Sequence, residues 1–202
     1  MHQEFYKKIY SPKELYVTLY KGLRTMKYMR RSKMNHELTT ELTERIMLAV
    51  TEVNGCEICS YGHTKMALEQ GMSEEEIETI LSGNTEQIPK EELTAILFAQ
   101  HYADTRGWPS EASWRRVIDE YGLPKALGIL GSIRMIMIGN IVGIAFSALR
   151  SRLKGNSVEK TGILYEIGML LSCLIFLPIS VLHGLISDLF RVPIISFTKK
   201  LA

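Results

Sequence analysis

The amino-acid sequence predicts an all-α protein built as a helical bundle. Apolar residues recur at spacings of three and four, as in the series Leu15, Leu19, Leu23 and Met26, and this is the period of an amphipathic helix. Helix start and stop signals follow one another at short intervals. No segment alternates polar and apolar residues over the length of a strand before a hairpin turn. The hydrophobic share of 46% and the charged share of 23% are typical of a folded globular chain.

These signals divide the chain into successive helices. Ser11, Pro12 and Glu14 form a capping box with proline at the first helical position, so the first helix should begin at Pro12. Thr39 or Thr40 can cap a second helix that runs to about Val53. The later helices are expected from about Cys56 to Gly71, over 73–83, from Pro89 to Asp104, from Ser110 to Gly122, and from Pro124 to about Lys154.

The C-terminal part of the chain differs in composition. Residues 167–187 are 21 residues without a formal charge, and at about 1.5 Å per residue they could cross a bilayer. Pro178 in the middle and the flanking Glu166 and Asp188 argue against a spanning helix. We therefore favour two helices that break near Pro178 and pack in an oligomer of identical subunits, with a membrane segment as the alternative. Residues 1–155 are then a helical domain, and residues 156–202 are a helical extension at the oligomer interface.

Charge is unevenly distributed along the chain. Residues 1–35 hold nine Lys or Arg and two Glu, whereas residues 37–92 hold thirteen acids and three bases. The six basic residues between Lys21 and Lys33 could contact nucleic acid or a membrane surface. We favour a basic helix lying against an acidic body, its own or that of a neighbouring subunit, and expect neither a nucleic-acid nor a membrane partner. With three Cys and no signal-peptide pattern at the N-terminus, a reducing, cytoplasmic location is expected.

Residues 54–63, N-G-C-E-I-C-S-Y-G-H, contain the strongest functional signal. Cys56, Cys59 and His63 are spaced so that all three lie on one face of a helix. They begin at its N-terminus, where the helix dipole favours an anion, and the anionic thiolate is the reactive form of cysteine. The pattern provides a nucleophile, a second thiol within disulfide reach, and an acid or base. Two alternatives remain: a pair of inert buried thiols, or a zinc site completed by a carboxylate or by a distant histidine such as His101.

Glu44 is twelve residues before Cys56 on the preceding helix. A tight connection at Asn54-Gly55 would make the two helices antiparallel. The Glu44 carboxylate could then orient the His63 imidazole or relay a proton. A solvated residue in the first turn of its helix is an equally good interpretation of Glu44.

Residues 43–77, T-E-R-I-M-L-A-V-T-E-V-N-G-C-E-I-C-S-Y-G-H-T-K-M-A-L-E-Q-G-M-S-E-E-E-I, resemble the alkylhydroperoxidase D-like, or carboxymuconolactone decarboxylase, family. The pattern of its redox members matches at Glu44, Cys56, Cys59, His63 and Gly71. The resemblance covers residues 38–83 well and extends more loosely to about 155. It implies an all-helical fold that forms dimers, trimers or hexamers, and the reduction of hydroperoxides by a cysteine pair.

The resemblance also implies a role for each residue. Cys59 would be the peroxidatic thiol, and Cys56 would resolve it and exchange with a thiol or dithiol reductant protein. His63 and Glu44 would relay protons, and no metal or organic cofactor is expected. Some members have a histidine between the two cysteines, whereas this chain has Glu57-Ile58 there. The acid adds negative charge, which disfavours a thiolate.

These patterns lead to the hypothesis of a thiol-dependent peroxidase or disulfide reductase. Two alternatives belong to other classes. One is a non-catalytic redox sensor or interaction protein, whose disulfide would change how the C-terminal apolar helices pack. The other is a structural protein that binds zinc.

Overall fold

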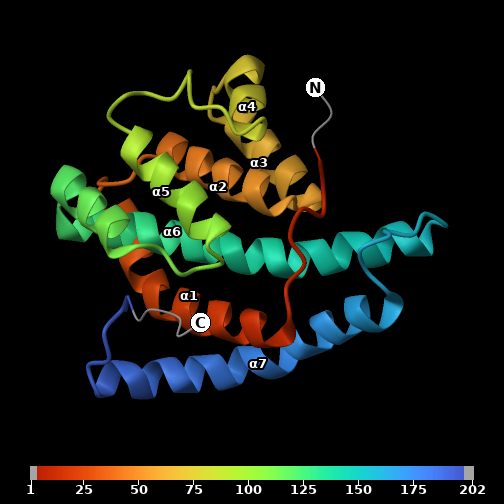
Figure 1. Cartoon of the computed structure of the whole chain (residues 1–202). Helices are drawn as coiled ribbons and strands as arrows, with labels where there is room; N and C mark the ends of the chain where they lie inside the picture. The colour runs from red at the N-terminus through yellow and green to blue at the C-terminus, as the bar shows by residue number, and fades with distance from the viewer. Residues whose placement is uncertain (1–3, 198–202) are drawn as a thin grey trace.

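The computed structural model describes residues 4–197, and all regular secondary structure in that range is helical, which confirms the predicted all-α fold (Figure 1). The helices are α1 (Pro12–Met34), α2 (Thr40–Asn54), α3 (Glu57–Glu69), α4 (Glu74–Leu81), α5 (Leu93–Asp104), α6 (Glu111–Leu153) and α7 (Ile163–Leu189).

The helices begin where the capping signals predict. The side chains of Ser11, Thr39, Ser73 and Ser110 each accept a hydrogen bond from a backbone N–H in the first turn of the following helix. α6 is interrupted at Gly122, where φ is 72° and ψ is 157°, so the predicted break before Pro124 is confirmed.

α5 begins later than predicted, at Leu93 instead of Pro89. Residues 89–92 form a turn in which the Glu92 N–H donates to the Pro89 carbonyl at 2.8 Å. The Glu92 carboxylate is held by Arg45 of α2. This tertiary ion pair therefore fixes the residues just before α5 in a turn.

The prediction of two C-terminal helices that break near Pro178 is wrong. α7 is one continuous helix of 27 residues with Pro178 in its interior. A proline removes one helical hydrogen bond and crowds the preceding turn. That local cost is overridden because α7 packs on α1 and α6 along one side and is tied to them near both ends.

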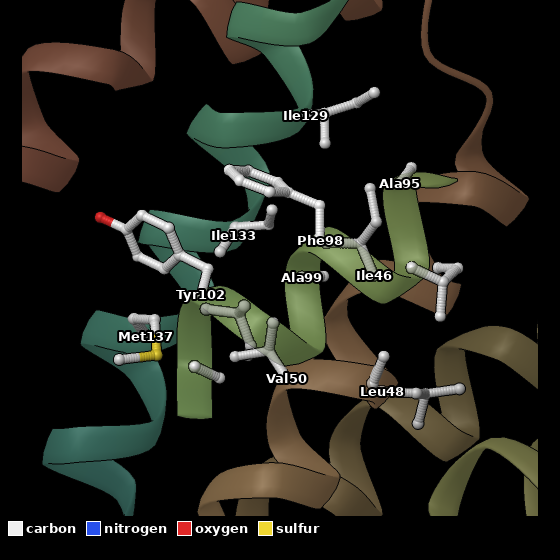
Figure 2. Close-up of a cluster of buried hydrophobic side chains, with 14 of the residues drawn as sticks. Ile46, Leu48, Val50, Ala95, Phe98, Ala99, Tyr102, Ile129, Ile133 and Met137 are labelled. Atoms are coloured by element: carbon white, nitrogen blue, oxygen red, sulfur yellow. The ribbon is translucent and has the colours of Figure 1, made fainter. Parts of the chain in front are cut away.

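α6 is the central helix of the fold (Figure 1). α2 and α5 lie on one side of it, and α1 lies on the other side, between α6 and α7. The core forms where α2, α5 and α6 meet, and most of its side chains are fully buried. Figure 2 shows Ile46 and Val50 of α2, Phe98 and Tyr102 of α5, and Ile129, Ile133 and Met137 of α6 in this cluster.

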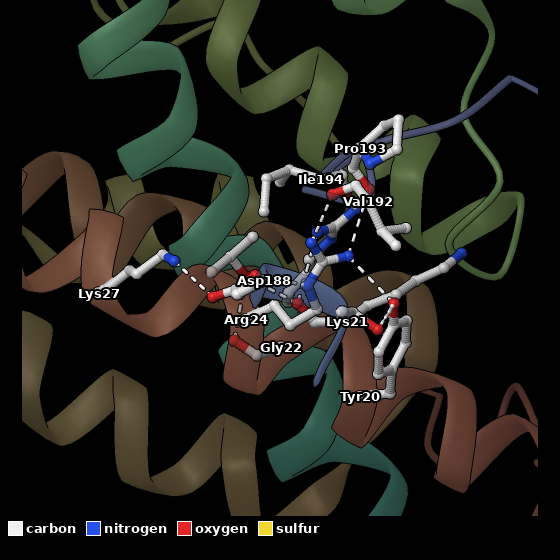
Figure 3. A network of polar contacts seen from close by, with 12 residues as sticks. Tyr20, Lys21, Gly22, Arg24, Lys27, Asp188, Val192, Pro193 and Ile194 are labelled. Carbon is white, nitrogen blue, oxygen red and sulfur yellow. Dashed lines mark hydrogen bonds and ion pairs between the residues drawn. The ribbon is translucent and has the colours of Figure 1, made fainter. Parts of the chain in front are cut away.

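Ion pairs anchor α7 near both ends. Near its start, the buried Glu166 carboxylate accepts hydrogen bonds from Arg152 at 2.8 and 2.9 Å and from Thr161 at 2.7 Å. Near its end, Asp188 accepts from Arg24 at 2.9 Å and from Lys27 at 2.5 Å (Figure 3). The charges that bracket the apolar segment therefore hold it against the rest of the fold.

The basic helix α1 does not pack against the acidic helices. Its helix neighbours in the described part of the chain are α6 and α7. The acid-rich start of α4, with Glu74, Glu75 and Glu76, lies on the far side of α6 (Figure 1). Only the segment before α1 meets acids of the central region and α5, where Lys7 pairs with Glu52 and Lys8 pairs with Asp104. The molecule is therefore electrically polarised, with its basic α1 next to α7.

Glu166→Gln tests whether the Arg152 ion pair holds α7 in place. The variant keeps the size of the side chain and loses the charge, so we expect a lower free energy of unfolding in urea at pH 7. The matched control Glu111→Gln removes a solvent-exposed ion pair with Arg115. Such pairs contribute little to the free energy of unfolding. A loss no larger than that of the control would contradict the anchoring role.

The same variant has a defined pH dependence. Hydrogen bonds from Arg152 lower the pKa of Glu166 from its ordinary value. A carboxylate with a lowered pKa stabilises the fold above its ordinary pKa, and this contribution is lost as the pH falls through the lowered value. The difference in stability between wild type and Glu166→Gln should therefore shrink in acid. If the difference in stability between wild type and Glu166→Gln stays constant from pH 7 to strongly acid pH, the ionised Glu166 does not provide this stabilisation.

Candidate functional site

The chain reverses between α2 and α3 at Asn54 and Gly55. Gly55 has φ of 72°, a left-handed conformation that favours glycine, and a Cβ there would lie 2.6 Å from the Lys7 backbone nitrogen. The segment before α1 clamps this turn from outside. The Tyr6 N–H donates to the Gly55 carbonyl at 2.7 Å, and the Tyr10 hydroxyl donates to the Asn54 side chain at 2.5 Å. The predicted tight connection is therefore present, and it is rigidly held.

The two cysteines lie at the start of α3. Cys56 is the N-cap residue, and its Sγ accepts a hydrogen bond from the Cys59 N–H at 3.3 Å. The pair forms a disulfide, with the two Cα atoms 5.3 Å apart. Cys56 is fully buried, whereas Cys59 is partly exposed. The two thiols of the motif thus have different access to solvent.

His63 and Glu44 are brought together by the reversal of the chain. His63 Nδ1 lies 2.8 Å from Glu44 Oε2, and the two side chains are only 16% and 9% exposed. Glu44 is therefore not a solvated first-turn residue. When Nδ1 carries a proton and donates it to Glu44, Nε2 is left as the ring's acceptor. The carboxylate can thereby set both the tautomer and the orientation of the imidazole.

An apolar groove of about 630 Å³ opens beside these residues. Cys59 and His63 lie at its wall, whereas Cys56 and Glu44 lie behind the wall. Residues of α1, α3, α6 and α7 line the groove: Leu19, Ile58, Cys59, Gly62, His63, Ile136, Ile138, Gly139, Val142, Gly143, Phe146, Cys173 and Leu177. The accessible thiol and the imidazole therefore face a largely hydrophobic space.

Gly143 of α6 is a site residue that sequence reasoning missed. A Cβ at this position would lie 2.7 Å from Cys56 Sγ and 2.8 Å from Cys59 Sγ, closer than real contacts allow. The absent side chain is what lets α6 pass directly against the disulfide. The sequence shows only that Gly143 is a glycine within an apolar helical segment. That pattern does not predict which residues of other helices will contact Gly143.

The two residues between the cysteines point to different environments. Glu57 is exposed and accepts a hydrogen bond from the Tyr6 hydroxyl at 2.8 Å, and it does not line the groove. Ile58 contributes to the groove wall. The acid that we expected to disfavour a thiolate is thus held outside the groove.

Two of the side chains considered as a fourth zinc ligand beside Cys56, Cys59 and His63 have other partners. Glu52 pairs with Lys7, and His101 Nε2 accepts a hydrogen bond from the Ser110 N–H at 3.2 Å. Within residues 4–197, no group of three or more His, Cys, Asp or Glu side chains is placed to hold a metal ion.

Gly143→Ala tests the fit between α6 and the disulfide. Overpacking of this kind costs about 1–3 kcal/mol, so the equilibrium constant for disulfide formation should fall about tenfold or more. It can be measured by thiol titration in mixtures of oxidised and reduced dithiothreitol. The control Gly139→Ala lies on the same helix, and its Cβ would meet nothing nearer than Ile136 Cδ1 at 3.7 Å. Equal behaviour of the two variants would show that Gly143 does not make room for the disulfide.

Comparison with known proteins finds a family similarity for the region that contains these residues. Residues 19–101 match the model of the carboxymuconolactone decarboxylase family. The match contains Glu44, Cys56, Cys59 and His63, and it ends before α6 and α7. No curated protein and no solved structure matched the chain. Residues 19–101, less than half of this all-helical chain, are therefore similar to the carboxymuconolactone decarboxylase family.

Proposed function

We propose that the protein is a thiol-dependent peroxidase that reduces hydroperoxides through Cys56 and Cys59. One observation carries the proposal: the accessible thiol, Cys59, lines the same groove as an imidazole that a buried carboxylate holds in place. A nucleophile needs a neighbouring base, and the base needs a group that orients it. Cys59, His63 and Glu44 have this relationship.

The oxidative half-reaction begins with reduced Cys59. His63 Nε2 accepts the thiol proton, and Glu44 stabilises the resulting imidazolium through Nδ1. The Cys59 thiolate attacks the terminal peroxide oxygen, so that an S–O bond forms and the O–O bond breaks. The alkoxide leaves as an alcohol with a proton from His63, and Cys59 becomes a sulfenic acid.

Cys56 then resolves the sulfenic acid. The Cys56 thiol loses its proton, its thiolate attacks Cys59 Sγ, the S–O bond breaks, and the hydroxide takes up that proton and leaves as water as the disulfide forms. The N-cap position favours the Cys56 thiolate, because its Sγ accepts the Cys59 N–H at the positive end of the α3 dipole. The disulfide is the form that the structure contains.

A dithiol reductant completes the cycle by attacking Cys59. The family resemblance implies that Cys56 exchanges with the reductant. We assign this thiol–disulfide exchange to Cys59 instead, because Cys56 is fully buried and Cys59 faces the groove. The attacking thiolate forms a mixed disulfide with Cys59 and releases the Cys56 thiolate. The second thiol of the reductant then displaces Cys59, which leaves the reductant oxidised and both cysteines reduced.

The lining of the groove indicates the kind of hydroperoxide. Apolar side chains of α1, α6 and α7 surround the space next to Cys59, and the polar side chain among them is His63. Burial of a hydrocarbon body there is favourable. Hydroperoxides with an apolar body, such as cumene hydroperoxide, are therefore the proposed substrates.

Serine variants of the two cysteines test the proposal. With cumene hydroperoxide and a dithiol, we expect Cys59→Ser to abolish turnover. Cys56→Ser should still consume one equivalent of peroxide and leave a sulfenic acid on Cys59, which dimedone traps for mass spectrometry. If wild type fails to turn over with any dithiol while its assembly state shifts on oxidation, the protein is a redox sensor instead.

Glu44→Gln tests the proton relay separately from the thiols. Without the carboxylate, the His63 imidazolium loses its partner, and we expect kcat to fall about a hundredfold, in the range of general acid–base effects. The disulfide should still form. Glu69→Gln, an equivalent change at an exposed position of α3, serves as the control. If kcat is unchanged in Glu44→Gln, this carboxylate does not take part in the proton transfer.

A further inference from the structure

α7 exposes an apolar surface that has no partner within the molecule. Among residues 4–197, α6 and α7 are the two helices that are long and apolar enough to cross a membrane. The most apolar part of α6 is 72% buried, so α6 is the core helix of the fold. The corresponding part of α7 is only 17% buried.

The outward face of α7 comprises Leu171, Leu174, Leu182 and Leu185, which are 54%, 71%, 61% and 65% exposed. The opposite side of the helix, at Met169, Ser180, Gly184 and Ser187, is buried against the protein. No residue from 167 to 187 carries a formal charge, so the exposed surface is uncharged over about 30 Å of helix.

Basic side chains lie just beyond the C-terminal end of this face. α1 runs parallel to α7, because Tyr20 bonds Ser187 and Lys27 bonds Asp188. Arg30 and Arg31 follow Lys27 on the same stripe of α1, one turn further along, and both are exposed. Arg191, exposed after α7, adds to the positive charge at this end.

Charged residues also lie at the N-terminal end of α7 and on the opposite side of the molecule. The loop before α7 carries the exposed Lys154 and Lys160 together with the exposed Glu159, and Lys160 has Glu4 as a partner at 3.5 Å, so this end is less basic than the C-terminal end. The acid-rich helix α4 lies on the opposite side of the molecule, away from α7 (Figure 1). An apolar face with a cluster of cations near its C-terminal end, and with the acid-rich α4 on the opposite side of the molecule, is complementary to an anionic lipid surface.

We propose that the outward face of α7 binds an anionic lipid bilayer, with the helix lying parallel to the membrane plane. α7 remains attached to the protein in this arrangement. Arg24 and Arg134 donate to the carbonyl groups of Val192 and Ile194 at 2.6 and 3.0 Å, which holds the chain after α7 against α1 and α6 (Figure 3). A spanning orientation would separate α7 from these contacts and from its ion pairs.

The charge pattern favours lipid over a second copy of the chain. In a parallel pair through α7, the basic ends of the two copies would lie together. In an antiparallel pair, Arg30 and Arg31 would approach a loop that carries Lys154 and Lys160 beside the acid Glu159, so its net charge is also positive. A coiled-coil seam is also narrow and is flanked by charged residues, whereas this face is broad and uncharged. The proposal is independent of the peroxidase chemistry.

Vesicle flotation with the purified full chain tests the proposal. One set of vesicles contains three parts phosphatidylcholine to one part phosphatidylglycerol, and the other contains phosphatidylcholine alone. Wild type should float with the anionic vesicles, less at high salt, and more weakly with the neutral ones. Failure to float with anionic vesicles at low salt would overturn the proposal.

The apolar contribution is tested by combining Leu174→Gln, Leu182→Gln and Leu185→Gln. We expect this variant to stay at the bottom of the gradient, with an unchanged circular dichroism spectrum because all three side chains are exposed. The matched control combines Leu68→Gln, Leu97→Gln and Leu123→Gln, exposed leucines of other elements, and should float like wild type. Equal flotation of the two variants would exclude α7 as the lipid-binding surface.

The basic contribution is tested by Arg30→Gln with Arg31→Gln. Each cation near an anionic surface favours binding, so the partition coefficient should fall about tenfold. The control combines Lys65→Gln with Lys90→Gln. It removes the same amount of charge from residues outside α1 and α7 and should leave the partition coefficient nearly unchanged. If wild type does not float and light scattering shows a dimer that the α7 variant converts to a monomer, a second copy covers this face and the proposal fails.

Discussion

The reversal of the chain at Asn54 and Gly55 is the constraint on which the site depends. It makes α2 and α3 antiparallel, so that the Glu44 carboxylate lies beside the His63 ring. It also ends α2 immediately before Cys56, which becomes the N-cap of α3. The turn is held by the backbone of the segment before α1 and by the buried contact between Tyr10 and Asn54. The left-handed Gly55 and the contacts that hold this turn thus set both the position of the His63 imidazole beside Glu44 and the position of the thiols.

α6 and α7 build the rest of the site from outside the matched family region. α6 approaches the disulfide through Gly143, because no side chain at that position separates the helix from the two sulfur atoms. α7 closes the groove with Cys173 and Leu177. Residues of α7 therefore contribute both to the groove and to the proposed lipid-binding face.

The sequence was a good guide wherever the signal was local. Ser11 and Thr39 cap helices as predicted, and the break at Gly122 is present. The spacing of Cys59 and His63 predicts a shared helix face, and both line the groove, whereas Cys56 is the N-cap of α3 and is buried. Pro178 is the counter-example, because its local effect on the helix was outweighed by packing and ion pairs with residues far away in the sequence.

The sequence by itself determined the helices, their caps and the cysteine motif, since each depends on residues within a few positions of one another. Tertiary structure alone decided three other features. It gave Glu44 a partner instead of solvent, it placed Gly143 beside the sulfur atoms, and it left one side of α7 exposed. These features depend on which helix faces come together, and the periodicity of a single helix specifies an apolar face without specifying what will cover it.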